Sequence, residues 1–162
     1  MNPCPGRPVN RLTILSYRLG AAIVGVRWAR VALTRGHASL LRWTRGRFPG
    51  SRNHLLLRTT GRKTGRMRSV PLIYVEDGDR YVVVASSGGS NRVPSWWRNL
   101  EVAPDALIEI QGRTIRVRGA EASASERDAI WPTLVFTYPP YDDYVARSAR
   151  RIPVVLLTPT DP

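Results

Sequence analysis

The sequence predicts a mainly β protein, a small barrel of about six antiparallel strands with short flanking helices. Three observations favour this class. The 162-residue chain has the size of one domain, short runs rich in β-branched residues recur along it, and turn residues separate these runs. Strands do not alternate with helices, and no Gly-x-Gly-x-x-Gly motif occurs, which argues against a Rossmann domain.

The first 53 residues differ from the rest in charge. They hold ten arginines and no acidic residue, whereas residues 54–162 hold the other 15 basic residues against 12 acidic ones, a net charge of +3. We therefore divide the chain into a basic N-terminal region, 1–53, and a barrel domain, 54–162. Residues 1–10 are expected to be a flexible tail. Apolar residues at spacings of three and four then predict a basic helix from Arg11 to about Leu33.

Arginines interrupt this helix, so we expect neither a membrane span nor a signal peptide. Two interpretations stay open. The apolar face of the helix packs on the barrel, or residues 11–53 bind an anionic membrane surface. We expect a cytoplasmic protein, peripheral on the inner face of the cell membrane in the second case. Nucleic-acid binding is disfavoured, because the excess positive charge lies outside the barrel.

Turn residues divide the barrel domain into strands and helices. Strands are expected at residues 54–60, 69–75, 80–86, 106–111, 114–122 and 152–158. Gly78 and Gly112 each predict a hairpin turn between neighbouring strands. Helices are expected at residues 94–100, from 123 to about 136, and at 141–150. Ser123 and Glu126 have the spacing of a capping box at the start of the second helix.

A basic loop, TTGRKTGRMR, separates the first two strands. Gly61 and Gly65 allow a tight turn whose backbone amides can point at an anion. Arg62, Lys63 and Arg68 supply charge suited to phosphate or carboxylate groups. The spacing is not that of a P-loop. The loop therefore predicts an anion-binding turn, and the alternative is a basic turn that lies in solvent.

Neither a disulfide framework nor a metal site is expected. The single cysteine, Cys4, lies in a tail rich in proline and glycine. His37 and His54 have no ligand partners near them in the sequence. A lone cysteine suits a reducing compartment.

Five segments of the domain, taken together, resemble the deazaflavin-dependent nitroreductase family, the coenzyme F420-dependent quinone reductases of mycobacteria and related actinobacteria. In order along the chain they are TTGRKTGRMRSVPLIYV, DGDRYVVVASSGG, PSWWRNLEVAP, WPTLVFTYPPYDDY and RRIPVVLL. The resemblance implies a split β-barrel related to oxidoreductases that bind flavin mononucleotide (FMN). It also implies an enzyme that transfers a hydride from reduced F420 to a quinone or nitro-type acceptor. FMN is the less favoured cofactor, and a deazaflavin-binding or storage protein with little turnover is the alternative function.

The resemblance further implies a role for each motif. The basic loop would hold the phospholactyl-polyglutamate tail of the cofactor through Arg62, Lys63, Thr64 and Arg68. Trp96 and Asn99 would lie beside the cofactor groove. A strand end would lie along the deazaflavin ring, and it consists of Val84, Ala85, Ser86, Ser87 and Gly88.

The catalytic candidates are Tyr138, Tyr141 and Ser86. The motif YPPYDDY repeats tyrosine every three residues, which places these side chains roughly on one face of a helical turn. In the resembled family, tyrosines of this motif line the substrate side and donate hydrogen bonds. Ser86 would stabilise developing charge or the cofactor carbonyl. The alternatives are core packing for the tyrosines and turn formation for Ser86.

Overall fold

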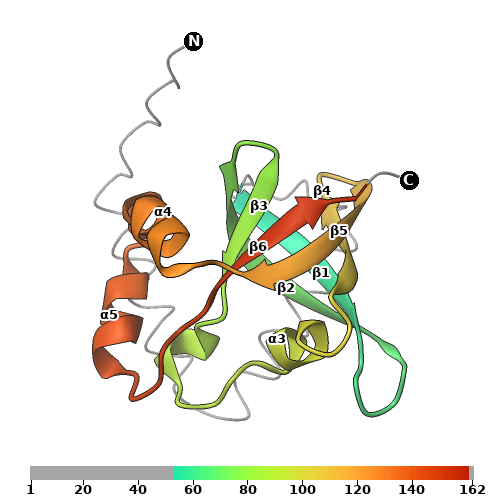
Figure 1. The fold of residues 1–162 in the computed structure, drawn as a ribbon, viewed down its shortest axis with the longest axis horizontal. Helices are drawn as coiled ribbons and strands as arrows, with labels where there is room; N and C mark the ends of the chain where they lie inside the picture. Colours follow the sequence, from blue (N-terminus) through green and yellow to red (C-terminus); the bar gives the residue numbers. More distant parts are fainter. Residues whose placement is uncertain (1–52, 161–162) are drawn as a thin grey trace.

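The computed structural model describes residues 53–160, which form a closed barrel of six antiparallel strands (Figure 1). Around the barrel the strands follow the order β1-β2-β3-β6-β5-β4, and pairing of β4 with β1 closes it. The strands are β1 (His54–Thr60), β2 (Met67–Asp77), β3 (Arg80–Val84), β4 (Asp105–Ile110), β5 (Arg113–Glu121) and β6 (Val154–Pro159). The predicted fold class, with six antiparallel strands, is confirmed.

Short helices flank the barrel as expected. They are η2 (Ser87–Gly89), α3 (Ser95–Leu100), α4 (Ala124–Thr137) and α5 (Pro140–Arg147). In Figure 1, α4 and α5 lie along one side of the barrel and α3 lies at its lower end. The predicted tail and basic helix lie outside the described residues, and so does the proposed membrane segment except for its last residue, Asn53.

Two tight turns connect neighbouring strands as the sequence predicts. Gly78, between the paired residues Asp77 and Arg80, has a φ of 64°. Gln111 and Gly112 link β4 to β5 with φ angles of 50° and 84°. Positive φ at both central residues is the requirement of a type I′ hairpin turn, which glycine meets without steric cost.

Side-chain alternation along the strands builds two apolar clusters. The interior cluster includes Leu55, Leu57, Val83, Ala85, Val155 and Leu157, together with Trp96, Trp97 and Leu100 of α3. The outer cluster lies under α4 and α5 and includes Val75, Val82, Val84, Val154, Leu156, Leu134, Tyr141 and Tyr144. Because successive strand residues face opposite sides, Val84 belongs to the outer cluster and Ala85 to the interior one.

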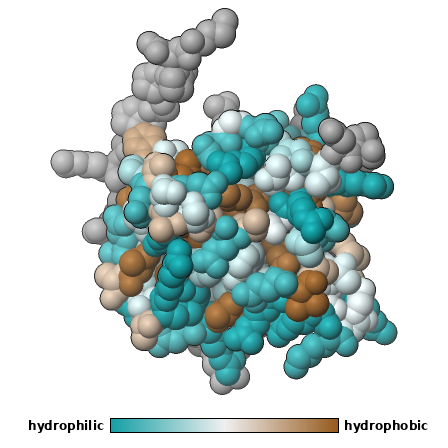
Figure 2. Space-filling view, in the orientation of Figure 1, coloured by the Kyte–Doolittle hydropathy of each residue, from teal (hydrophilic) through white to brown (hydrophobic). Residues whose placement is uncertain are grey.

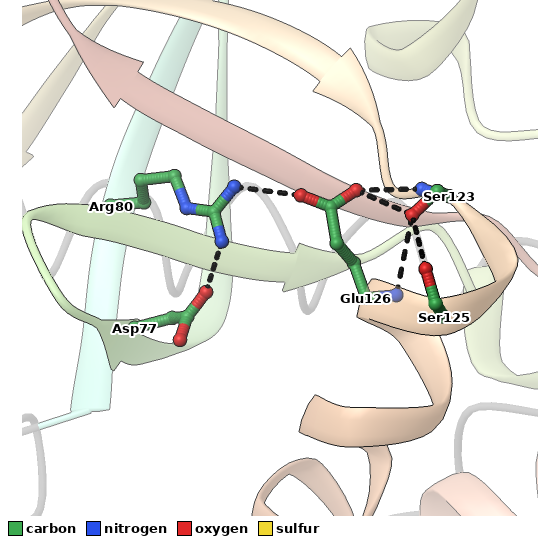
Figure 3. Close-up of polar contacts among 5 residues, drawn as sticks. All are labelled: Asp77, Arg80, Ser123, Ser125 and Glu126. Carbon is green, nitrogen blue, oxygen red and sulfur yellow. Dashed lines mark hydrogen bonds and ion pairs between the residues drawn. The ribbon is translucent and has the colours of Figure 1, made fainter.

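A polar network ties the start of α4 to the β2–β3 hairpin (Figure 3). The Glu126 N–H donates to Ser123 Oγ at 3.3 Å and Glu126 Oε2 accepts from the Ser123 N–H at 2.9 Å, which confirms the predicted capping box. Arg80 donates to Glu126 Oε1 at 2.9 Å and to Asp77 Oδ2 at 2.6 Å. Hydrogen bonds from Ser123, followed by those from Arg80, lower the pKa of Glu126 to about 2.

The large apolar side chains that stay exposed are dispersed over the surface. Within the described residues they are Met67, Val102, Phe136 and Val145, which come from different parts of the fold. Figure 2 shows hydrophobic residues in small groups on the face viewed. No helix within residues 53–160 is long and apolar enough to cross a membrane.

Candidate cofactor site

A cavity of about 610 Å³ lies where the β1–β2 loop meets α3. It is lined by Gly61, Arg62, Lys63, Thr64, Arg68, Ser69, Val70, Ser95, Trp96 and Asn99. All four predicted residues of the basic loop are in this lining, as are Trp96 and Asn99. The fold therefore brings together two motifs that the sequence alone leaves apart.

Two glycines shape the basic loop. Gly65 has a φ of 65°, and its N–H donates to the Gly61 carbonyl at 2.7 Å, as does the Thr64 N–H at 3.0 Å. A Cβ on Gly61 would lie 2.9 Å from the Arg66 carbonyl oxygen. Such a contact is too close for another residue without a backbone shift, so glycine at this position permits the loop to close.

Asn99 fixes the loop to α3 and β1. Its Oδ1 accepts from the N–H and from Nη1 of Arg62, both at 3.2 Å, while its Nδ2 donates to Thr59 Oγ1 at 3.1 Å. Asn99 and Thr59 are buried, so these bonds satisfy polar groups that are costly to leave unpaired. Asn99 thus lines the cavity and also orients Arg62.

Most backbone amides of the loop donate within the protein, so they are not available to an anion. The N–H groups of Arg62, Thr64 and Gly65 donate to Asn99 and Gly61, and the Gly61 N–H donates to the Arg66 carbonyl at 2.9 Å. Closing the turn consumes these donors. Anion recognition in this cavity therefore depends mainly on side chains.

The cavity is cationic. Arg62, Lys63 and Arg68 line it, and no acidic residue does. None of the ion pairs formed within residues 53–160 includes any of the three. Their charges are therefore available to an anionic ligand.

The two tryptophans of α3 have different positions. Their rings meet edge to face, with centroids 6.3 Å apart, and both side chains are buried. Trp96 lines the cavity, whereas Trp97 is absent from the lining and packs in the interior cluster. Trp96 therefore supplies an aromatic wall of the cavity, which Val70 also lines.

The other predicted cofactor contacts lie at the end of β3 and in η2, outside the cavity lining. Val84 and Ala85 are buried, and Ser86 is 9% exposed. The Ser86 side chain makes no cap bond to the turn that it precedes. Ser87 and Gly88 both have positive φ, 50° and 64°. A left-handed serine is uncommon and indicates that tertiary contacts hold this turn.

The predicted catalytic tyrosines pack against one another beside this turn. The hydroxyl oxygens of Tyr138 and Tyr144 are 2.9 Å apart, and the rings of Tyr138 and Tyr141 meet edge to face at 4.9 Å. Burial raises the pKa of Tyr141, so its hydroxyl keeps its proton at neutral pH. Gly89 packs on Tyr144, since a Cβ there would lie 3.2 Å from the Tyr144 Cα. The tyrosines therefore adjoin the strand end and do not line the cavity.

Reasoning from sequence missed Arg150. Its guanidinium donates to the carbonyl oxygens of Ala85, Ser86 and Ser90, which precede it by 60 to 65 residues. Arg150 is the first residue of the segment RRIPVVLL, to which the resemblance assigns no role. No local pattern reveals partners at such a separation.

The structure is a closed antiparallel barrel with a cationic cavity between a glycine-bounded loop and a tryptophan helix, an arrangement suited to an anionic cofactor. Residues 33–159 match the family of F420H2-dependent quinone reductases, and the chain belongs to this family. Membership implies coenzyme F420 as the cofactor. The match begins at residue 33, so it includes residues 33–53 of the basic N-terminal region.

Individual relatives agree with this assignment. An F420H2-dependent quinone reductase of Mycobacterium tuberculosis is 38% identical over 135 residues, which cover 79% of this chain and 91% of the relative. A solved structure of an F420-H2 dependent reductase is 36% identical, with a TM-score of 0.61 over 65% of this chain and 94% of that one. A further solved structure, described only as a domain-swapped dimer, is 31% identical, with a TM-score of 0.62 over 75% of this chain and 94% of that one. The resemblance inferred from the five segments is confirmed.

Proposed function

We propose that this protein transfers a hydride from reduced coenzyme F420 to a quinone, and that the cavity holds the anionic part of the cofactor. The observation that carries the proposal is the set of cations, Arg62, Lys63 and Arg68, in a cavity without a carboxylate. The tail of the cofactor consists of phosphate and glutamate groups, which these side chains fit. Family membership supports the identity of the ligand.

The charged and hydroxyl side chains of the cavity have different parts in holding this tail. Lys63 and Arg68 offer charged donors, each worth about 1.5–3 kcal/mol when bonded to an anionic group. Arg62 is oriented by Asn99, so it loses less conformational freedom when it binds. The hydroxyls of Thr64 and Ser95 supply neutral donors in the same lining.

On the acceptor side, we assign Tyr138, Tyr141 and Ser86 as catalytic residues. When bound, the reduced cofactor supplies the hydride. An acceptor oxygen that gains electrons needs a proton or a hydrogen-bond donor. The buried Tyr141 hydroxyl, which keeps its proton, suits the part of the hydrogen-bond donor. The Tyr138 hydroxyl is held by its partner on Tyr144. The Ser86 hydroxyl makes no cap bond, so it can donate to a carbonyl of the ligand.

A nitro compound is a second acceptor class that we propose for the same site, because its oxygens need the same donors. We also propose that residues 11–53, which are basic and carry apolar residues, attach the protein to the anionic inner face of the cell membrane. Hydrophobic quinones reside in the bilayer, which would place the enzyme beside its acceptor.

Oxidation of reduced F420 by menadione tests the function. We expect many turnovers per protein molecule, dependent on both substrates. Cofactor binding without turnover would contradict the proposal and favour a binding or storage protein. A parallel assay with a nitroimidazole tests the second acceptor class, since failure with that compound alone limits the enzyme to quinones.

A further inference from the structure

The backbone of residues 85–90 adopts a conformation that needs outside support. Ser87, Gly88 and Gly89 are three consecutive residues with positive φ, at 50°, 64° and 75°. A side chain at the first of them makes this conformation unfavourable. Such segments persist where surrounding contacts over-determine them.

Arg150 supplies the main polar contact. Its Nη2 donates to the carbonyl oxygens of Ala85 at 2.8 Å and Ser86 at 3.0 Å, and its Nε donates to that of Ser90 at 3.0 Å. These carbonyls lie on both sides of η2, so a single guanidinium bridges the turn from one end to the other. The neighbouring Ala149 N–H adds a bond to Asn91 Oδ1 at 2.9 Å.

The charge of Arg150 is directed at the backbone alone. Arg150 takes part in none of the ion pairs formed within residues 53–160, and partial burial lowers its pKa without removing the charge. A guanidinium presents its N–H groups in a fixed planar fork, whereas an ammonium is a point charge. The fork of Arg150 reaches carbonyls on both sides of the turn from one side chain.

The direction of these carbonyls also fixes the direction of the N–H groups in the same peptide units. In a trans peptide the N–H points away from the C=O. Since the carbonyls of Ala85 and Ser86 face Arg150, the N–H groups of Ser86 and Ser87 face the other way. Neither N–H donates to an acceptor within the described part of the chain. Arg150 therefore sets the orientation of the peptide groups in this segment.

We propose that Arg150 is a positioning residue, which holds segment 85–90 in the conformation that receives the deazaflavin ring. The identity of the ligand rests on the function proposed above. The support that Arg150 gives to the backbone does not depend on that function.

Hydrogen exchange without cofactor tests the support itself. Peptides that cover residues 85–91 are compared by mass spectrometry in the wild type, Arg150→Met and Arg151→Met. Arg151 is the matched control, because its side chain is exposed and pairs with Glu121 instead. We expect exchange in this segment to accelerate about tenfold or more in Arg150→Met, since the three bonds to its carbonyls are lost, and to stay unchanged in Arg151→Met. Equal exchange in all three proteins would overturn the proposal.

Cofactor titration tests the consequence. We expect Arg150→Met to raise the dissociation constant of F420 and its KM roughly tenfold, while the KM of menadione changes little. Arg150→Lys should resemble Arg150→Met, and ethylguanidinium should restore part of the binding to Arg150→Ala. Full activity in Arg150→Lys would show that charge alone matters and would overturn the positioning role.

Two outcomes need separate treatment: failure of Arg150→Met to fold, and failure of the wild type to bind F420. If Arg150→Met does not fold, Asn91→Ala, which loses the bond to Ala149, replaces it. Asn91→Ala must then show faster hydrogen exchange and weaker F420 binding, both at smaller size. Wild-type behaviour of Asn91→Ala would overturn the proposal. If the wild type does not bind F420, the proposed function fails, and hydrogen exchange still decides whether Arg150 supports the segment.

Discussion

At the scale of single residues, the cations of the cavity differ in how they are held. Arg62 bonds to Asn99 through its backbone and its side chain, so part of its hydrogen-bonding capacity serves the loop. Lys63 and Arg68 form no ion pair within the described residues and lie in the same lining. We therefore expect Lys63 and Arg68 to contribute more directly to ligand affinity.

Replacing Lys63 or Arg68 by alanine should weaken F420 binding. Each loses a charge-assisted contact, so the dissociation constant should rise roughly tenfold or more, with a smaller effect on turnover once the cofactor saturates. Fluorescence titration measures the affinity. Arg66→Ala is the matched control, because Arg66 belongs to the same loop but does not line the cavity. Unchanged affinity in both test variants would remove these residues from the cofactor site.

The tyrosines should affect turnover more than affinity. Tyr138→Phe and Tyr141→Phe each remove a hydroxyl that we propose meets charge developing on the acceptor, and such contacts act mainly in the transition state. We expect kcat with menadione to fall by about tenfold or more while the dissociation constant of F420 changes little. Tyr81→Phe on β3 is the control. Wild-type rates in both test variants, on several quinones, would assign the tyrosines to packing.

At the scale of elements, the helices connect the site to the barrel. α3 carries Trp96 and Asn99 to the basic loop, and α5 packs on η2 through Tyr144 and Gly89. α4, in turn, begins at a polar network anchored on the β2–β3 hairpin. Loss of this network would loosen α4, against whose C-terminal end the tyrosines pack.

The network should make stability depend on pH. The pKa of Glu126 is lowered from 4.5 to about 2, so its contribution is present above pH 4.5 and is lost as the pH falls toward 2. Glu126→Gln should lower Tm at neutral pH, and its Tm should converge on that of the wild type near pH 2. Thermal melts between pH 7 and pH 2 measure this. Asp128→Asn, an exposed acid on the same helix, should show no such convergence, and a constant difference in Glu126→Gln would contradict the assignment.

The elements show where sequence patterns suffice. The run HLLLRTT is bounded by a basic glycine loop, and β1 has the predicted limits, 54–60. β2 extends two residues beyond each predicted end, because pairing of Thr60 with Met67 and of Asp77 with Arg80 prolongs the hairpins. α5 ends at Arg147, before the predicted limit at residue 150. The last turn unwinds where Ser148 becomes extended and Arg150 turns toward the η2 segment.

The candidate site shows where sequence patterns do not suffice. Charge and glycine spacing, with the resemblance, pointed to the loop residues and to Trp96 and Asn99, all of which line one cavity. The sequence did not reveal that the Arg62 amide is used within the protein, because its acceptor lies 37 residues away on Asn99. The contacts of Arg150 depend in the same way on how distant segments fold together.

At the scale of the whole molecule, the positive charge is divided between two regions. The barrel domain has a net charge of +3, and three of its cations, Arg62, Lys63 and Arg68, line the cavity. The first 53 residues add ten arginines. The first group suits a small anionic ligand. The second suits an extended anionic surface.

Removing the N-terminal region should abolish membrane binding. Basic residues near an anionic bilayer contribute about 1 kcal/mol each, so the full chain should sediment with phosphatidylglycerol vesicles at low salt and be released at high salt. A chain that starts at Arg52 should stay in the supernatant yet bind F420 and reduce menadione. Equal sedimentation of both would contradict the attachment. Loss of folding on truncation would favour packing of this region on the barrel.

Binding of the cofactor by the cavity is the central claim, and titration tests it most directly. Purified full-length protein is titrated separately with F420 and with FMN, and absorbance and fluorescence are followed at two salt concentrations. We predict saturable binding of F420 that is tighter than that of FMN and weakens as salt screens the cavity cations. Binding of FMN alone, or F420 affinity that does not respond to salt, would contradict the assignment of the cationic cavity to the deazaflavin tail.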